Sequence, residues 1–363
     1  MKLSVPEHIL SIKPYSPGKP IEALEREYGI AKAIKLASNE NPLGPSPKAV
    51  KAIQDALDNL NRYPDGSGYY LTKKISGKLG VLPGNIILGN GSDEIISMLA
   101  TALLTPGDEA LLTQPAFLMY DIMVRGVGAT PVYVPLKSLC ADLKEMKNRI
   151  TPRTRLVFLN NPNNPTGTFI SKAEFEDFIE GVPSEILVVL DEAYIEFVRG
   201  DHCAFGLDYF NEEKAIVILR TFSKAYGLAG LRIGYGIMPE SISNLLHRIR
   251  PPFNTNVLAQ IGAAAALDDE DFLNKTVRLV HEELDFFHAV FDQKGIRYFP
   301  SETNFFLIDV QKNADEVFEG LLRQGVIVRS MTSYGYPEYI RVNVGVHEEN
   351  VRFVEALESV LKS

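Results

Sequence analysis

The chain contains no tryptophan, only two cysteines and no excess of positive charge. Cys140 and Cys203 lack the short spacing of metal-binding or redox pairs, so we expect reduced thiols and no disulfide. The formal net charge is −9, and without a basic block we expect no nucleic-acid partner. The six histidines are scattered without ligand spacing, so we assign no metal.

Long apolar runs are also missing. No stretch approaches the ~20 residues of a membrane-spanning helix, so we expect no membrane partner. Residues 1–20 have no long apolar core behind basic residues, which argues against a signal peptide and for a cytoplasmic location. The 363 residues, of which 45% are hydrophobic, are enough for two domains.

Composition divides the chain into three parts. Residues 1–46 are rich in proline and predict an extended arm, with one short helix, that packs on the small domain and on a partner subunit. Residues 47–265 alternate short Val, Ile and Leu runs with helical patterns, which is typical of a large α/β domain whose mostly parallel sheet is sandwiched by helices. Residues 266–363 predict a smaller α+β domain.

The stretch RTFSKAYGLAGLRIGY, residues 220–235, follows a hydrophobic strand pattern. In it, Lys224 comes shortly after the hydroxyls of Thr221 and Ser223, and Arg232 follows eight residues later. An amine forms a Schiff base with an aldehyde, whereas hydroxyls and a guanidinium bind phosphate. The stretch therefore indicates a site for a phosphorylated aldehyde, although a lysine in such a loop is more often simply solvated.

An acidic residue, Asp191, comes directly after the apolar run ILVVL. A buried carboxylate needs a cationic partner, since leaving it unpaired is unfavourable. The protonated ring nitrogen of a pyridoxal cofactor meets that need. Tyr194 is three residues further on, close enough to reach the same ring.

Two turns and two arginines complete the candidate site. GNGSDE, residues 89–94, places backbone N–H groups at a helix start, which suits either an anion or an ordinary helix cap. It lacks the third glycine of a dinucleotide fingerprint and the Gly-Lys-Ser/Thr of a Walker loop. NPNNPTG, residues 161–167, predicts a rigid loop. Arg329 and Arg341 lie in or beside strand patterns, either as surface residues or as ligands for an anionic substrate.

Together these motifs resemble those of the aspartate-aminotransferase-like (fold type I) pyridoxal-phosphate enzymes, and within them the histidinol-phosphate aminotransferases. The resemblance covers nearly the whole chain and includes PYSPGKP, KLASNENPLGPSP, RYPDG, GNGSDEII, QPAFLMY, NPNNPTG, LDEAYIEF, TFSKAYGLAGLRIGY and YIRVNVGVHEEN. NPNNPTG, LDEAY and the lysine stretch mark the class, and the arm, RYPDG and NENPLGPSP mark the subfamily. The resemblance implies pyridoxal 5'-phosphate as cofactor and a homodimer.

The resemblance also implies a role for each candidate. Lys224 would bind the cofactor aldehyde and move a proton, Asp191 would keep the ring nitrogen protonated, and Tyr194 would bond the phenolic oxygen. The other cofactor contacts would be Gly91, Ser92, Asp93, Phe117, Asn164, Thr221, Ser223, Arg232 and, from the partner subunit, Tyr63. The substrate contacts would be Tyr15, Asn41, Arg329 and Arg341.

The implied reaction is transamination of L-histidinol phosphate with 2-oxoglutarate, giving imidazole acetol phosphate and L-glutamate, in L-histidine biosynthesis. Both amino donors end in an anion, so one pocket can serve both half-reactions. Two other enzymes stay open at this point, an aromatic amino-acid aminotransferase and a threonine-phosphate decarboxylase. A pyridoxal-phosphate-binding regulatory module is a further alternative, but such regulators usually carry a basic helix-turn-helix region, which this sequence lacks.

Overall fold

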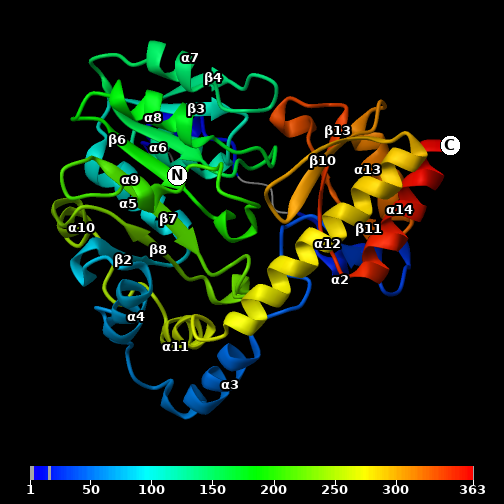
Figure 1. Cartoon of the computed structure of the whole chain (residues 1–363), viewed down its shortest axis with the longest axis horizontal. Coiled ribbons are helices and arrows are strands. Elements are labelled where there is room, and N and C mark those ends of the chain that lie inside the picture. The colour runs from blue at the N-terminus through cyan, green and yellow to red at the C-terminus, as the bar shows by residue number, and fades with distance from the viewer. Residues whose placement is uncertain (1–3, 15–17, 363) are drawn as a thin grey trace.

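The computed structural model describes residues 4–14 and 18–362, which form a large lobe and a small lobe joined by one long helix (Figure 1). No helix in this part of the chain is long and apolar enough to cross a membrane. The long helix, α12 (Glu270–Lys294), runs from the base of the large lobe into the small lobe. Gly295 ends it in the left-handed conformation that favours glycine.

The large lobe is built on a seven-stranded sheet of order β2-β8-β7-β6-β5-β3-β4. Only β8 runs antiparallel to its neighbours, as predicted for a mostly parallel sheet. The strands are β2 (Ile86–Gly89), β3 (Glu109–Gln114), β4 (Thr130–Pro135), β5 (Thr154–Asn160), β6 (Leu187–Asp191), β7 (Ile216–Thr221) and β8 (Gly234–Ile237).

Helices cover both faces of this sheet, so its strands are buried on both sides. Alternate side chains of β6 and β7 pack into two separate cores, because successive residues of a strand point to opposite faces. The first core is completed by α3 (Pro47–Ala56), α4 (Tyr69–Leu79), α7 (Leu143–Asn148), α8 (Lys172–Glu180) and α11 (Val257–Ala266). The second is completed by α5 (Ser92–Leu103), α6 (Leu118–Gly126) and α10 (Glu240–Leu246).

The small lobe packs helices against an antiparallel sheet of order β12-β13-β10-β9. Its core is aromatic, with Phe287 and Phe291 of α12 against Phe305 and Phe306. The strands are β9 (Arg297–Phe299), β10 (Phe305–Asp309), β12 (Arg329–Ser330) and β13 (Tyr339–Asn343), and the other helices are α13 (Ala314–Arg323) and α14 (His347–Lys362). Short helices elsewhere are α9 (Gly206–Tyr209), η1 (Leu57–Asn59), η2 (Pro83–Asn85), η3 (Ile195–Phe197), η4 (Ala229–Leu231) and η5 (Thr332–Tyr334).

The N-terminal segment is less extended than its prolines predict. Besides the expected helix, α2 (Ile21–Tyr28), it contains α1 (Glu7–Leu10) and β1 (Ile34–Lys35). Strand β1 pairs in parallel with β11 (Val326–Ile327) of the small lobe. The number of prolines does not reveal this pairing, because it depends on a segment that is distant in the sequence. The next residues, 36–41, lead from the small lobe to the cavity described below.

Candidate functional site

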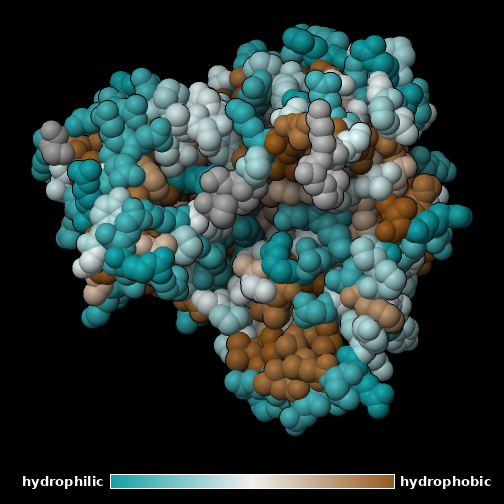
Figure 2. Space-filling model, turned by 180° about the vertical axis from the view of Figure 1, so that it is seen from behind, coloured by the Kyte–Doolittle hydropathy of each residue, from teal (hydrophilic) through white to brown (hydrophobic). Residues whose placement is uncertain are grey.

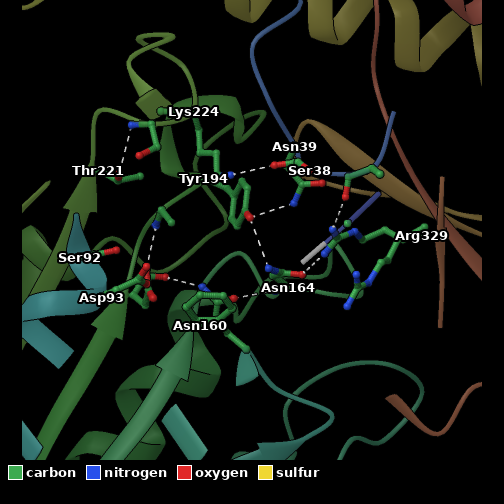
Figure 3. Close-up of a pocket in the computed structure, with 18 of the residues that line it drawn as sticks. Ser38, Asn39, Ser92, Asp93, Asn160, Asn164, Tyr194, Thr221, Lys224 and Arg329 are labelled. Atoms are coloured by element: carbon green, nitrogen blue, oxygen red, sulfur yellow. Dashed lines mark hydrogen bonds between the residues drawn. The ribbon is translucent and has the colours of Figure 1, made fainter. Parts of the chain in front are cut away.

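A cavity lies at the carboxyl ends of β5, β6 and β7, where ligands bind in open α/β sheets (Figure 3). Residues from the small lobe and the segment 37–39 form its other walls. The predicted site residues that line it are Ser92, Asp93, Phe117, Asn164, Asp191, Tyr194, Thr221, Ser223, Lys224, Arg232, Arg329 and Arg341. Folding thus brings together candidates that are scattered over most of the sequence.

Asp191 ends β6 with its side chain buried, at 3% exposure. Its Oδ2 accepts a hydrogen bond from the Tyr120 hydroxyl at 2.6 Å, and its Oδ1 accepts one from the Ala193 N–H at 3.1 Å. No cationic side chain of the described residues forms an ion pair with it, and burial raises the pKa of Asp191 to about 6. A cation placed beside this carboxylate is therefore favoured, because it would compensate the buried charge.

Tyr120 was not predicted, although it stands in QPAFLMY three residues after Phe117. Both lie at the start of α6, and their rings meet edge to face with centroids 5.6 Å apart. Tyr120 also stacks on Phe158 at 4.8 Å, which fixes the ring that bonds Asp191. Phe117 lines the cavity, as expected for an aromatic residue that stacks on a cofactor ring.

Tyr194 is the centre of a hydrogen-bond network between the lobes (Figure 3). Its hydroxyl accepts from Asn39 Nδ2 at 2.9 Å and from Asn164 Nδ2 at 3.4 Å. Arg341 donates to Asn164 Oδ1 at 2.5 Å and to the Ala37 carbonyl at 3.0 Å. Burial raises the pKa of Tyr194 to about 12, so its hydroxyl keeps a proton to donate to a ligand.

Lys224 projects into the cavity from the loop after β7. Its Nζ donates to the Ser38 carbonyl at 3.1 Å and lies 5.9 Å from the centre of the Tyr194 ring. Burial, together with the nearby positive charge of Arg341, lowers the pKa of Lys224 to about 8. The amine is therefore far more often neutral, and so nucleophilic, than an exposed lysine near neutral pH.

The start of α5 and Arg232 form a concave site suited to a phosphate. Gly91 is the N-cap residue, with φ of 78°, and no side chain caps the helix. The Arg232 guanidinium lies beside this turn, 3.4 Å from Asp93 Oδ2 and 3.5 Å from Ser223 Oγ. A Cβ atom on Gly91 would lie 2.6 Å from Arg232 Nη2, so glycine is needed for this approach. Thr221, at the end of β7, completes the same wall.

Three of the predicted residues are not seen in the lining of the cavity. Tyr15 lies outside the described residues. Asn41 does not line the cavity, and its Nδ2 instead donates to the Ala225 carbonyl at 2.9 Å and to Thr276 Oγ1 at 3.2 Å. Asn41 thus braces the loop beside Lys224. Tyr63 is 82% exposed and stacks on Phe253 with ring centroids 4.7 Å apart, outside the lining of the cavity.

Two asparagines were missed. Asn39 lies in SNENP, and its side chain bonds Tyr194, whereas only Asn41 had been selected from that motif. Asn160 ends β5, and it donates to the Asp191 carbonyl at 2.9 Å and accepts from the Asn164 N–H at 2.7 Å. The position of Asn160 after VFL was an available signal, since polar residues at strand ends face this edge of the sheet.

Residues 31–357 match the family described as aminotransferase class I and II. The chain belongs to this family. A histidinol-phosphate aminotransferase of Moorella thermoacetica is 48% identical over 98% of this chain and 92% of the relative.

Two solved structures share the fold. The histidinol-phosphate aminotransferase from Sinorhizobium meliloti, in complex with pyridoxal-5'-phosphate, superposes with a TM-score of 0.90 at 28% identity and covers 98% of this chain and 96% of its own. An aspartate aminotransferase of Thermus thermophilus superposes with a TM-score of 0.84 at 24% identity, over 99% and 100% of the two chains. The predicted aspartate-aminotransferase-like α/β fold is confirmed.

The cavity fits pyridoxal 5'-phosphate, and the predicted cofactor is confirmed by the family and by the likeness to a structure that contains it. The fit rests on three features of this chain. Asp191 is buried without a cation, the turn at Gly91 admits the Arg232 guanidinium, and Lys224 has an amine of lowered pKa.

Proposed function

We propose that this protein transfers the amino group of L-histidinol phosphate to 2-oxoglutarate, giving imidazole acetol phosphate and L-glutamate in histidine biosynthesis. The supporting observation is a cavity that combines the residues for a phosphorylated pyridine aldehyde with two further arginines, Arg329 and Arg341, on paired strands of the small lobe. The identity to a histidinol-phosphate aminotransferase over nearly the whole chain points to the same substrates.

When bound, pyridoxal phosphate supplies an aldehyde that takes up amino groups and a protonated ring that accepts electrons. Each residue of the site has its own role in the rest of the reaction. Lys224 would hold the aldehyde through its neutral amine and would serve as the group that moves a proton of the substrate's reacting carbon. Asp191 would hold the proton on the ring nitrogen, while Tyr194 and Asn164 would donate hydrogen bonds to the phenolic oxygen.

The phosphate of the cofactor is held by the N–H groups of Ser92 and Asp93 at the start of α5, following Gly91. Arg232 adds a guanidinium with hydrogen bonds in a fixed fork. The hydroxyls that complete this site are those of Thr221 and Ser223. Phe117 stacks on the ring.

Arg341 binds the terminal anion of each substrate, a carboxylate in glutamate and a phosphate in histidinol phosphate. A guanidinium suits both, because its planar fork matches either group bidentately. Arg329 stands opposite Arg341 in the register of β12 and β13 and adds a second positive charge. Tyr15 and Asn41 remain predicted contributors, Asn41 by bracing the loop of Lys224.

We infer a homodimer that acts in the cytoplasm. Figure 2 shows an apolar area at the end of the large lobe where α3 and α11 lie, and Leu57 and Leu60 beside α3 are 47% and 53% exposed. Tyr63 is the predicted residue that reaches the phosphate site of the partner subunit. The three-part division into an arm of residues 1–46, a large domain of 47–265 and a small domain of 266–363 is part of the same proposal.

A panel of amino donors with 2-oxoglutarate tests the reaction. Histidinol phosphate, phenylalanine, tyrosine, aspartate and threonine phosphate are compared by kcat/KM for formation of glutamate, with carbon dioxide release measured for threonine phosphate. We expect histidinol phosphate to be the preferred donor. A higher kcat/KM for an aromatic amino acid, or decarboxylation of threonine phosphate, would assign the protein to one of those two activities instead.

A further inference from the structure

Behind the cofactor site, the two central strands carry a charged pair on the opposite face of the sheet. Strands β6 and β7 are parallel neighbours, with Asp191 opposite Leu219. Because successive side chains alternate between faces, Asp191 and Thr221 point to the cavity side. Their chain neighbours, Glu192 and Arg220, therefore share the other face.

Glu192 and Arg220 form an ion pair that is almost fully removed from water. The side chain of Glu192 is 0% exposed and that of Arg220 is 12% exposed, and both Nε and Nη2 of Arg220 lie 2.8 Å from Glu192 Oε2. The other oxygen, Oε1, accepts from the Gly206 N–H at 2.5 Å, and the Glu192 N–H donates to the Leu219 carbonyl at 2.8 Å. Both ends of the carboxylate are therefore fixed, to β7 and to the start of α9.

Arg220 also interacts with the Tyr235 hydroxyl and, more weakly, with the carboxylate of Glu196. Arg220 lines a second cavity, behind the sheet, together with Glu196, Tyr226 and Tyr235. Among the described residues Glu192 is the carboxylate that pairs with Arg220, and Glu196 forms no ion pair. Glu192 is the main charged partner of the guanidinium, and one side of that group faces the second cavity.

We propose that Glu192 and Arg220 are a positioning pair, which holds the ends of β6 and β7 together and so sets the distance between Asp191 and the segment 221–224. The inference rests on the proposed function, because one ligand is held by both strand ends, its ring by Asp191 and its phosphate by Thr221. Neither member of the pair lines the cofactor cavity. A misplacement of ~1 Å in such a site can lower a rate ~100-fold.

The pair is not needed to keep the strands associated. Backbone hydrogen bonds join β6 to β7, and apolar side chains pack on both faces of the two strands. A buried ion pair contributes little net stability compared with apolar packing. Its removal should therefore affect the geometry of the strand ends more than the fold.

Two conservative variants test the proposal. Arg220→Lys keeps the charge but loses the planar fork, and Glu192→Gln keeps the shape but loses the charge. The dissociation constant of pyridoxal phosphate is measured by absorbance titration, kcat and KM for glutamate by assay, and unfolding of the cofactor-free protein by heat. We expect the dissociation constant to rise and kcat to fall about tenfold or more, with KM for glutamate changed less than about threefold, because Arg341 is untouched.

A second arginine–glutamate pair, at the amino ends of strands in the same sheet, provides a control. Arg153 Nε lies 2.8 Å from Glu109 Oε1 and links the residue before β5 to the first residue of β3, with the side chain of Glu109 6% exposed and that of Arg153 68% exposed. Arg153→Lys and Glu109→Gln should leave cofactor binding and kcat nearly unchanged. Equal losses in both sets of variants would refute the proposal, as would a folded Arg220→Lys protein with unaltered binding and kcat.

The double variant Glu192→Gln/Arg220→Gln removes both charges of the pair, so it can be measured even where a single variant fails to fold. Losses close to those of one single variant support a unit that acts together, whereas losses that multiply contradict it. The cofactor titration does not depend on the amino donor. If the wild type fails with histidinol phosphate, the proposed function is wrong while the positioning pair is still tested by the titration.

Discussion

At the scale of single residues, the protonation states of the site depend on what the cavity holds. Asp191 and Lys224 both have pKa values displaced toward their neutral forms, and burial is the main cause in each case. Buried charges are unfavourable unless they are paired. A ligand that places a cation beside Asp191 and a carbonyl carbon beside Lys224 suits both residues. The cation compensates the charge of the carboxylate, and the carbonyl carbon meets a neutral amine.

The first prediction concerns Asp191→Asn. The folded cofactor-free protein favours the protonated carboxyl, since its pKa is about 6 instead of 3.8, so stability falls as the pH rises from about 4 through 6. The cofactor-free variant should be more stable than wild type at pH 7, by roughly 2–3 kcal/mol at most, and equal to it below pH 4. Denaturant unfolding at a series of pH values measures this.

The same variant should lose activity when loaded with cofactor. Without a carboxylate the ring nitrogen is less protonated, and we expect kcat to fall roughly 100-fold, equivalent to ~3 kcal/mol. A variant with wild-type kcat would show that Asp191 is not the partner of the ring nitrogen, and a stability difference that does not depend on pH would contradict the raised pKa of Asp191.

The second prediction concerns Lys224. The rate constant for capture of pyridoxal phosphate should rise about tenfold per pH unit up to pH 8 and then level off, as its pKa of about 8 requires. Arg341→Met removes a positive charge that lowers this pKa, so its profile should shift to higher pH. Stopped-flow absorbance measures both profiles. A wild-type inflection near 10.5, the ordinary value for lysine, would contradict the lowered pKa.

At the scale of elements, the start of α5 brings the backbone of Gly91 close to the Arg232 side chain. Gly91→Ala would place a Cβ 2.6 Å from Arg232 Nη2 and force the guanidinium to move. We expect the dissociation constant of pyridoxal phosphate to rise about tenfold or more, since an interaction of the phosphate with a charged group is worth ~1.5–3 kcal/mol. Absorbance titration provides the measurement.

Gly80→Ala is the matched control for this helix start. Gly80 has a φ of 71°, close to the 78° of Gly91, but its Cβ position has no heavy atom within 4 Å. The alanine is more strained at Gly91, whose ψ of 168° lies in a region open almost only to glycine, than at Gly80, whose ψ of 24° is left-handed helical, so unfolding of both cofactor-free variants is measured beside the titration. Equal cofactor affinity in the two variants would mean that the position of Arg232 does not matter.

At the scale of the whole molecule, the exposed apolar residues of the large lobe predict association of two chains. Light scattering should give about twice the chain mass of 40.3 kDa. Leu60→Lys, at a residue 53% exposed, should shift the protein toward monomer and reduce kcat, because the partner's Tyr63 is lost from each site. Glu355→Lys on the small-lobe helix α14 is the control. A fully active monomer would contradict a shared site.

Most of the architecture could be read from the sequence because its causes are local. Ser46 and Pro47 predict the start of α3, and Ser46 Oγ does cap that helix. Apolar runs without alternation predict strands buried on both faces, which the large sheet has. Strand β1 was missed because the strand that it pairs with, β11, lies almost 300 residues away in sequence, with Val326 opposite Ile34.

The sequence by itself determined which groups can do chemistry, namely one amine near hydroxyls and an arginine, and one carboxylate after a buried strand. The chemical capabilities of these side chains follow from their residue type, so composition and spacing are enough to identify them as candidates. Only the tertiary structure decided which residues form hydrogen bonds with the site residues. Tyr120 bonds Asp191, and Asn39, not Asn41, bonds Tyr194. These choices depend on side-chain direction and on contacts between distant segments, which short-range patterns do not encode.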